Sequence, residues 1–488
     1  MALLKSLELS QVTGRLVYLL FTAALGPFLF GYHLAELNAP QDVITCKRER
    51  IKGDATSSTL PQCIPMSPLE IGLVSSIYTL GGLLGALSSG TFSARYGRLL
   101  SMRIASVVAL VGGLLTAVAP SIAVMSVGRF VSGLAAGSAT VVVPLFISEV
   151  APPGKKGMFG ALTQISTCSG IVVTQLLGYF LSHGQMWRII LAAAGGVGGV
   201  QFIGLLFAGE SPTWLAEHGQ ARQARVSLQR IRGEGVDISE ETSSWDAEDG
   251  YAAPEEQGLL SPASGPAHGK SEHRNMGIFE VFSNRKTLPA VFAVIMVMTA
   301  QQLCGINSIV MYGVSLLATL LTSSSALLNI LVSVLNLFVT VSCSPLPDKF
   351  GRKACILGSV AGMGTSSILL GIGIRASIPV LSAVATLCFV ASFSTGLGPV
   401  PFILASELVG PEAVSPVQSW ALASNWIATF VVAQFFPVVN EMLGKGITYF
   451  IFAGFAAFFF VFISWWVPET RGKKNADEAW GWEPRREE

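Results

Sequence analysis

Three amide side chains lie close together in an apolar part of the chain. Gln301, Gln302 and Asn307 occur within seven residues, and most of their neighbours are hydrophobic. Gly305 lies among them and lets a helix flex at this point. An amide both donates and accepts hydrogen bonds, so a group of amides suits the hydroxyls of a sugar or another polyol. Polar side chains are costly to bury in lipid and indicate a functional site, although amides also join one helix to another.

A histidine and a glutamate lie close together in the first apolar stretch. His33 and Glu36 are three residues apart, so a helix places them on one face. Histidine changes charge near neutral pH, and a carboxylate beside it stabilises the protonated form. The pair is a candidate for proton coupling or pH gating; the alternative is a hydrated polar pair at the outer end of the helix.

Arginine and glutamate residues recur where apolar stretches end. Arginine forms a planar, two-pronged contact with a carboxylate on a neighbouring helix. The candidate cations are Arg98, Arg129 and Arg352, and the candidate carboxylates are Glu149, Glu210, Glu407 and Glu469. Such ion pairs either form a gate that breaks when the protein changes conformation or hold neighbouring helices together permanently.

The composition indicates that lipid surrounds most of the chain. Of 488 residues, 51% are hydrophobic and only 12% are charged, roughly half the charged fraction of a soluble domain. The net charge is +1 and the basic residues form short clusters, which argues against a nucleic-acid partner. No cysteine spacing is typical of a metal site, and no catalytic set of nucleophile and base is recognisable. We therefore expect no metal, no cofactor and no enzyme activity.

Twelve apolar stretches are long enough to cross a bilayer. A hydrocarbon core of roughly 30 Å needs about twenty apolar residues in a helix, which satisfies its own backbone groups. We expect spans at 16–36, 70–91, 100–119, 122–144, 157–182, 188–208, 287–316, 323–345, 353–374, 377–404, 415–439 and 446–467. The sequence therefore predicts an all-α membrane protein with twelve transmembrane helices.

One long polar segment divides these helices into six and six. The expected domains are an N-terminal bundle (1–208), a cytoplasmic linker (209–286), a C-terminal bundle (287–467) and a cytoplasmic tail (468–488). The linker starts with helical spacing and continues from Trp245 as an acidic, Ser- and Pro-rich part, which we expect to be disordered, as a solvated linker or a regulatory site. Basic residues in the loops of one side predict that both termini are cytoplasmic, although the first outer loop is also basic.

Similar motifs recur at matching positions of the two halves. ARYGRLL follows the second span and PDKFGRKA the eighth, while SEVAPPGKKG follows the fourth and SELVGPEAVSP the tenth. This repetition predicts two pseudo-symmetric six-helix bundles with a substrate site between them near the membrane midplane.

Two of the seven cysteines, Cys46 and Cys63, lie in the polar loop between the first two spans. The other five lie in or beside apolar stretches. If the first loop faces an oxidising compartment, Cys46 and Cys63 can form a disulfide.

Nine motifs, in order, resemble the sugar-porter family of the major facilitator superfamily, which includes facilitative glucose transporters and proton-coupled sugar symporters. They are GPFLFGYHLAELNAPQ, GRFVSGLAAG, PLFISEVAP, ESPTWL, QQLCGINSIVMY, DKFGRK, GPVPFILASE, SNW and PETRGK, and they cover nearly the whole chain. One such motif is a weak signal, but nine in the right order are specific. The resemblance implies a carrier that moves a sugar or polyol by alternating access, with or without coupling to protons.

The resemblance also implies which side chains contact the substrate. It places the family's sugar-binding amides at Gln164, Gln301, Gln302, Asn307 and Asn336. Two positions depart from the family's glucose carriers, since Ser394 replaces a usual Glu and Phe402 a usual Trp. We therefore expect a pocket that selects another polyol or binds hexose weakly.

Three further positions are interpreted through the same resemblance. Trp426 and Tyr312 remain as aromatic surfaces that can stack against a sugar ring. Where His33 stands, the proton-coupled relatives carry Asp and the passive glucose carriers carry Asn. The histidine therefore leaves the coupling to protons open.

A nutrient sensor that keeps this fold and binds substrate without useful flux is the alternative function. A long cytoplasmic tail would favour a sensor, whereas only 16 residues follow Gly472. We expect a multi-pass transporter in the plasma membrane or in an internal membrane such as that of the vacuole. Its expected partners are a sugar or polyol, the lipid bilayer and, in a coupled mechanism, protons.

Overall fold

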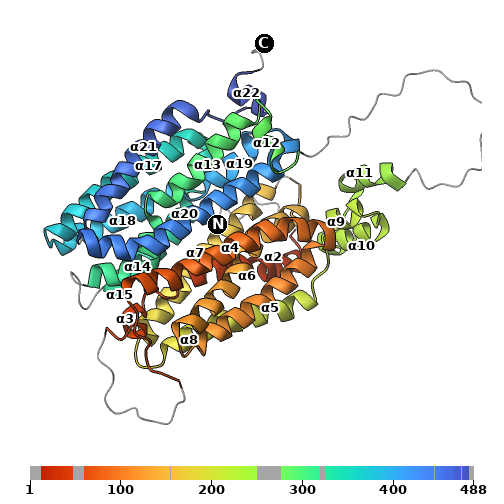
Figure 1. Cartoon of the computed structure of the whole chain (residues 1–488). Helices are drawn as coiled ribbons and strands as arrows, with labels where there is room; N and C mark the ends of the chain where they lie inside the picture. The colour runs from red at the N-terminus through yellow and green to blue at the C-terminus, as the bar shows by residue number, and fades with distance from the viewer. Residues whose placement is uncertain are drawn as a thin grey trace, which may run out of the picture.

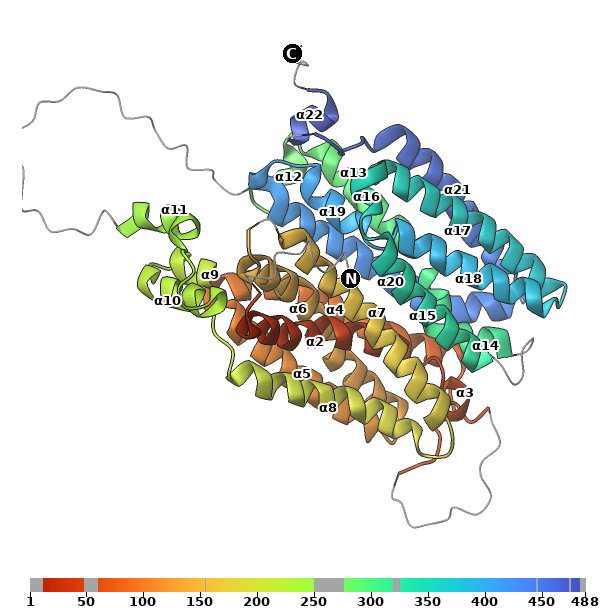
Figure 2. The same ribbon diagram turned by 180° about the vertical axis from the view of Figure 1, so that it is seen from behind.

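The chain folds into a bundle of long helices, seen from opposite sides of the computed structural model in Figure 1 and Figure 2. The structure describes residues 12–47, 60–153, 155–249, 276–318, 325–444, 446–473 and 475–482. Within these residues all regular structure is helical, and twelve helices are long and apolar enough to cross a membrane. The predicted fold class is therefore confirmed. The side of the membrane that each terminus faces stays a prediction.

The first six spans are continuous helices. They are α2 (Gly14–Ala35), α4 (Pro68–Tyr96), α5 (Arg98–Ala117), α6 (Ile122–Val150), α7 (Lys156–Leu181) and α8 (Trp187–Leu206), with the short α3 (Gln41–Ile44) in the first loop. Local sequence explains where α4 begins. Ser67 and Glu70 form a reciprocal capping box, and Pro68 occupies the first helical position, where no backbone N–H is needed.

Glycines allow α4 and α6 to pack backbone against backbone. A Cβ atom on Gly133 of α6 would meet the carbonyl oxygen of Tyr78, and one on Gly137 would meet that of Gly82. Small residues of this kind are the usual means of close helix packing in lipid, where no hydrophobic effect drives helices together. The close packing holds the N-terminal half together around α4 and α6.

Two of the six C-terminal spans are broken in the middle. The helices that form the spans of this half are α13 (Leu288–Leu303), α14 (Ile306–Ala318), α15 (Ser325–Cys343), α17 (Arg352–Arg375), α18 (Pro379–Thr395), α19 (Val400–Glu407), α20 (Val414–Leu443) and α21 (Ile447–Trp466). The seventh span breaks between α13 and α14 at Gly305, whose φ of +97° suits glycine. The tenth breaks between α18 and α19, before Pro399. The sequence singled out Gly305 as a flexible point, whereas the break in the tenth span was not predicted.

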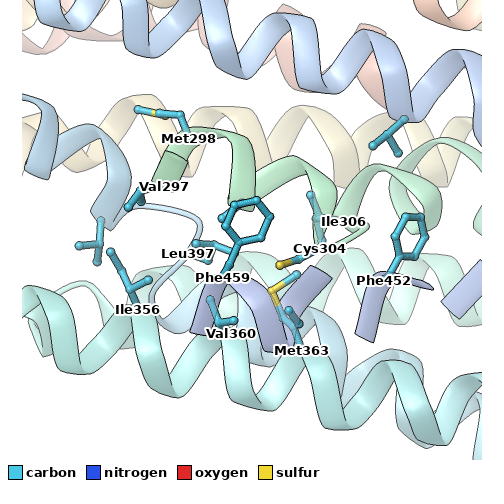
Figure 3. Packing of buried hydrophobic residues seen from close by; sticks show 14 of the residues in the cluster. Val297, Met298, Cys304, Ile306, Ile356, Val360, Met363, Leu397, Phe452 and Phe459 are labelled. Carbon is cyan, nitrogen blue, oxygen red and sulfur yellow. The ribbon is translucent and has the colours of Figure 1, made fainter. Parts of the chain in front are cut away.

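Hydrophobic side chains pack against the break between α13 and α14. Figure 3 shows Cys304, Met363 and Phe459 gathered there from three different spans. Phe452 occupies the space that a Cβ atom on Gly305 would need. Leu397, from the break between α18 and α19, joins the same hydrophobic cluster. The two breaks are thus packed into one core, which brings their polar groups together.

The two halves meet along two pairs of helices. α4 packs against α20, and α7 packs against α15. On the first pair, Gly72 lies against the backbone of Gln434 and Gly82 lies against the ring of Trp426. Residues from both halves therefore contact one another along these two interfaces.

The two ends of the bundle carry different accessory structure (Figure 1). At one end, near α3, a disulfide joins Cys46 and Cys63 across the first loop. At the other end lie the short helices α9 (Pro212–Glu217), α10 (Ala221–Arg232), α11 (Ser239–Asp249), α12 (Glu280–Ser283) and α22 (Ala476–Trp480). We refer to these as the disulfide end and the linker end. Two further short helices, α16 (Leu346–Phe350) and η2 (Pro411–Ala413), directly precede α17 and α20.

The linker is helical further than the sequence predicts. α9 and α10 match the expected helical part, but α11 continues to Asp249 and so includes Trp245, where we expected disorder to begin. Glu240 and Glu241 lie in its first turn, where negative charge interacts favourably with the helix dipole. The rest of the segment expected to be disordered, 250–275, lies outside the described residues.

Candidate functional site

Four amides form one network at the break between α13 and α14. Asn307 Nδ2 donates to Gln302 Oε1 at 2.6 Å. Gln302 Nε2 donates to Gln301 Oε1 at 3.1 Å and to Asn425 Oδ1 at 3.3 Å. Asn425, on α20, donates back to Gln301 Oε1 at 2.5 Å. The three amides singled out in the sequence are thus in direct contact, and a fourth completes the network.

Gln301 anchors this network to the second helix break. Its Nε2 donates to the carbonyl oxygens of Leu397 and Gly398, both at 2.8 Å, in the segment between α18 and α19. Since its Oε1 already accepts from Gln302 and Asn425, both N–H groups and both lone pairs of Gln301 are engaged. Among the described residues, Gln302 Oε1 and the Asn307 amide keep hydrogen-bonding positions that no protein group uses.

Asn336 lies in a second polar group. Its Oδ1 accepts from Ser394 Oγ at 2.7 Å and from Thr340 Oγ1 at 3.4 Å. Across the interface, Cys168 Sγ on α7 lies 3.8 Å from Thr340 Oγ1 and 3.7 Å from Gln164 Nε2. Gln164 and Asn336, from opposite halves, are therefore linked through these side chains.

The aromatic candidates occupy different positions. Tyr312 is buried, stacks on Phe436 and donates its hydroxyl to the carbonyl oxygen of Ala433 at 2.6 Å. Trp426 is buried at the interface of the halves. Its ring has edge contacts with Phe30 and Tyr78 of the N-terminal half.

Phe402, on α19, is 44% exposed, in contrast to Trp426 at 4%. The structure thus places Trp426 between the halves and leaves Phe402 largely uncovered.

His33 and Glu36 form a buried contact that includes a third residue. His33 Nδ1 lies 3.0 Å from Glu36 Oε1, and the Arg129 guanidinium binds the same carboxylate. Arg129 also donates to the carbonyl oxygen of His33 at 2.8 Å and lies over the Tyr78 ring, 4.5 Å from its centroid. His33, Glu36 and Arg129 are each only 1% exposed.

This contact joins residues that the sequence assigned to separate sites, and it is buried, unlike the hydrated pair considered as an alternative. Arg129 was grouped with the ion pairs at the loops, but the structure places it in the N-terminal half beside Glu36. The carboxylate and the guanidinium neutralise each other, as buried charges must. His33 Nε2 is enclosed and has no hydrogen-bond partner within the described part of the chain.

The remaining candidate ion pairs lie near the linker end. Arg98 binds Glu149 through Nε and a terminal nitrogen, the shortest contact being 2.8 Å. Glu210 accepts from the backbone N–H groups of Arg98 and Leu99 at the start of α5, at 3.0 to 3.1 Å. Burial raises the pKa of the Glu210 carboxyl, although these N–H groups and Arg98 oppose the shift.

The C-terminal half repeats this arrangement at the start of α17. Arg352 binds Glu407 at 2.9 Å, and Glu469 accepts from the backbone N–H groups of Arg352 and Lys353 at 2.8 and 3.1 Å. The correspondence reflects the internal repeat in the sequence. Each ion pair joins helices of one half, and among the described residues no ion pair crosses between the halves.

Besides the Cys168–Thr340 contact, hydrogen bonds of Asn38 and Ser76 join the halves toward the disulfide end. Asn38, just after α2, accepts from the backbone N–H of Val314 at 2.9 Å and donates to the carbonyl oxygen of Val310 at 2.8 Å. Ser76 on α4 donates to Gln434 on α20 at 2.7 Å. In this conformation the halves are therefore joined at the disulfide end.

Sequence reasoning missed Asn425 and Asn38. Both lie inside motifs that carried the family resemblance, Asn425 directly before Trp426 and Asn38 five residues after His33. A polar residue in or beside a membrane span is the signal that could have identified them. The sequence does not show which of them turns toward a partner helix.

Comparison with known proteins agrees with this geometry. Residues 19–480 match the family described as "Sugar (and other) transporter". A Saccharomyces cerevisiae protein described as "Probable metabolite transport protein YBR241C" is 33% identical over 478 residues, covering 96% of this chain and 96% of that protein. Facilitated glucose transporter member 2 of solute carrier family 2 from Sus scrofa is 29% identical, covering 96% of this chain and 94% of the relative.

A solved structure has the same fold. The xylose transporter XylE from E. coli, in a partially occluded inward open conformation, matches with a TM-score of 0.75 and 22% identity, covering 95% of this chain and 100% of that one. The resemblance inferred from the nine motifs is confirmed. The relatives are transporters and not enzymes.

Proposed function

This chain belongs to the sugar transporter family of membrane carriers, and we propose from its site that it moves a sugar or related polyol across the membrane by alternating access. The observation that carries this proposal is the network of Gln301, Gln302, Asn307 and Asn425 at two helix breaks. A cluster of uncharged amides matches the donors and acceptors of sugar hydroxyls. An ionic or acidic substrate would instead require an unpaired charged side chain in the site.

Within this site the amides have separate roles. Gln302 and Asn307 keep unused hydrogen-bonding positions and are the direct contacts, together with Asn336 and Gln164. Gln301 and Asn425 hold the network in place because their polar atoms are engaged by the protein. Trp426, buried between the halves, supplies an apolar ring face for the carbon skeleton.

The contacts between the halves support the alternating-access mechanism. Asn38 and Ser76 close the disulfide end in this conformation, while the ion pairs near the linker end lie inside single halves. Each half then moves as a rigid body, and opening the disulfide end breaks hydrogen bonds and no ion pair. This favours ion pairs of Arg98 and Arg352 that hold neighbouring helices together permanently over ion pairs that break during transport.

Proton coupling is the finer part of the proposal. His33 and Glu36 share one buried contact with Arg129, so a proton on His33 adds a positive charge next to a neutralised pair. Such a charge is tolerated only if the contact rearranges or gains water, which links the proton to the position of α2. Symport with protons, or gating by pH, follows from that link.

The transport test uses the purified protein in liposomes. We would measure uptake of labelled hexoses, pentoses and inositol, and then repeat the measurement with Gln302→Ala and Asn307→Ala. We expect one substrate class to be carried and its KM to rise at least about tenfold in both variants, the cost of one lost polar contact. Thr116→Val, which removes a hydroxyl bonded inside α5, is the control.

Two results would contradict the proposal. Uptake of the whole panel at the rate of empty liposomes would refute transport of these substrates, and stabilisation of the protein by one of them would then favour a sensor. Uptake that is the same with and without a proton gradient, and the same in His33→Asn, would refute proton coupling alone.

A further inference from the structure

Asn336 stands apart from the other amides because hydroxyls surround one side of it. Asn336 and Thr340 are one turn apart on α15, and Ser394 comes from the last turn of α18. Both hydroxyls point at Asn336 Oδ1, at 2.7 Å for Ser394 and 3.4 Å for Thr340. All three side chains are buried, at 2% to 8% exposure.

These contacts leave the amide nitrogen of Asn336 for another partner. A carbonyl oxygen has two lone pairs, and the two hydroxyls use both. Within the described residues no protein group accepts from Asn336 Nδ2, although the side chain is 6% exposed. Gln301 shows the opposite case, since the protein engages all of its polar positions.

The hydroxyls also hold the amide against rotation. The one hydrogen of Ser394 Oγ is shared between Asn336 Oδ1 and the carbonyl oxygen of Val390, which lies 2.8 Å away. Thr340 supplies the second donor, and its own hydroxyl touches Cys168 of the opposite half. Turning the amide over would remove both donors from Asn336 Oδ1 and would require Ser394 to direct its hydrogen to the carbonyl oxygen of Val390 alone.

We propose that Ser394, supported by Thr340, is a positioning residue that makes Asn336 a pure hydrogen-bond donor to the substrate. The carrier then selects, at one position of the sugar or polyol, an oxygen that accepts hydrogen bonds and need not donate. This inference rests on the proposed function, because it assigns a specificity to that same site. It distinguishes Asn336 from Asn307, whose amide keeps both kinds of group available.

The test compares deoxy and fluoro derivatives of whichever sugar the liposomes transport best. A deoxy position can neither donate nor accept, whereas fluorine accepts weakly and cannot donate. At the position that faces Asn336, we expect the deoxy compound to raise KM by roughly tenfold to a hundredfold, because a buried donor is left unpaired. The fluoro compound should stay within about threefold of the parent sugar there.

Variants at position 394 separate positioning from structure. Ser394→Ala frees the amide to rotate, so the difference between the deoxy and fluoro compounds should disappear at that position. Ser394→Thr keeps the hydroxyl and should keep the difference. Ser394→Asp places an acceptor there, turns Asn336 Oδ1 toward the substrate, and should make the fluoro compound as poor as the deoxy one. The unfolding temperature in detergent shows whether each variant is folded.

The outcomes also separate this inference from the proposed function. Normal uptake with a fluoro compound that is as poor as the deoxy compound at every position would overturn the inference and leave the carrier intact. So would an unchanged pattern in Ser394→Ala. Absence of uptake of every sugar would refute the proposed function and, with it, this inference.

Discussion

Replacing Asn38 with alanine should shift the carrier away from the conformation described here. Asn38 is fully buried, and its amide lies beside α14, where Val310 and Val314 are four residues apart, the spacing of a helical hydrogen bond. Two further contacts, to Ile309 O and Asn329 Oδ1, are long at 3.4 Å. The side chain therefore makes two good hydrogen bonds between the halves.

The size of the effect follows from those two bonds. Each is worth about 1 kcal/mol net, so Asn38→Ala removes up to about 2 kcal/mol from the state closed at the disulfide end. In the opposite state water binds the same groups, and the substitution costs little there. The ratio of the two states should therefore change by up to roughly 30-fold in favour of opening at the disulfide end.

Spin-label distances can measure that ratio. Leu69 on α4 and Met442 on α20 are 57% and 79% exposed and belong to opposite halves near the disulfide end, so cysteines there can carry the labels. The exposed Cys388 would first be replaced by serine. We expect a longer-distance population to grow in Asn38→Ala and to stay unchanged in Thr116→Val. A distance distribution identical to the parent protein would refute the assignment of Asn38 as a contact that closes this end.

Four further predictions concern stability, each measured by unfolding in detergent. Gly137→Ala should destabilise because its Cβ would meet the backbone of Gly82, whereas Gly90→Ala on the partner helix, with open space around it, should be neutral or slightly stabilising. Arg98→Ala should cost about 3–5 kcal/mol because Glu149 is left buried and unpaired, and the double replacement Arg98→Met with Glu149→Leu should recover most of that loss. Cys46→Ser should cost about 2–4 kcal/mol through the lost disulfide and should make the protein insensitive to reducing agent. Burial raises the pKa of the Glu210 carboxyl above its value in the unfolded chain. The stability that this carboxyl contributes is therefore present below about pH 4 and is lost as pH rises through the raised pKa. Over that range, the stability of the parent protein relative to Glu210→Gln should fall.

The helices and their order were predictable from the sequence because they depend on local composition. Each span needs only about twenty apolar residues, and the twelve expected stretches correspond to the twelve candidate spans. The sequence named Arg98 and Arg352 as candidate cations and Glu149 and Glu407 among the candidate carboxylates, but only the structure shows that Arg98 pairs with Glu149 and Arg352 with Glu407. The break at Gly305 was also visible in the residue type.

Partners across helices were decided by the tertiary structure. Arg129 was expected among the loop ion pairs, yet it binds Glu36, ninety-three residues away, because the packing of α2 on α6 brings their buried faces together. Asn425 joins the amide network only through the position of α20 beside the α13–α14 break. The sequence specifies which side chains are polar, but helix rotation and crossing decide which of them meet.

The roles of the individual side chains in the site also depend on contacts between helices and not on residue type alone. The sequence alone indicated that amides lie inside membrane helices, and it therefore predicted that the chain handles a neutral, hydrogen-bonding solute. Only the tertiary structure decided that Gln301 is fully engaged and that Ser394 and Thr340 occupy the carbonyl of Asn336. A hydrogen bond is short and directional, so which groups remain open for a substrate depends on distances of a few ångströms between helices far apart in the chain.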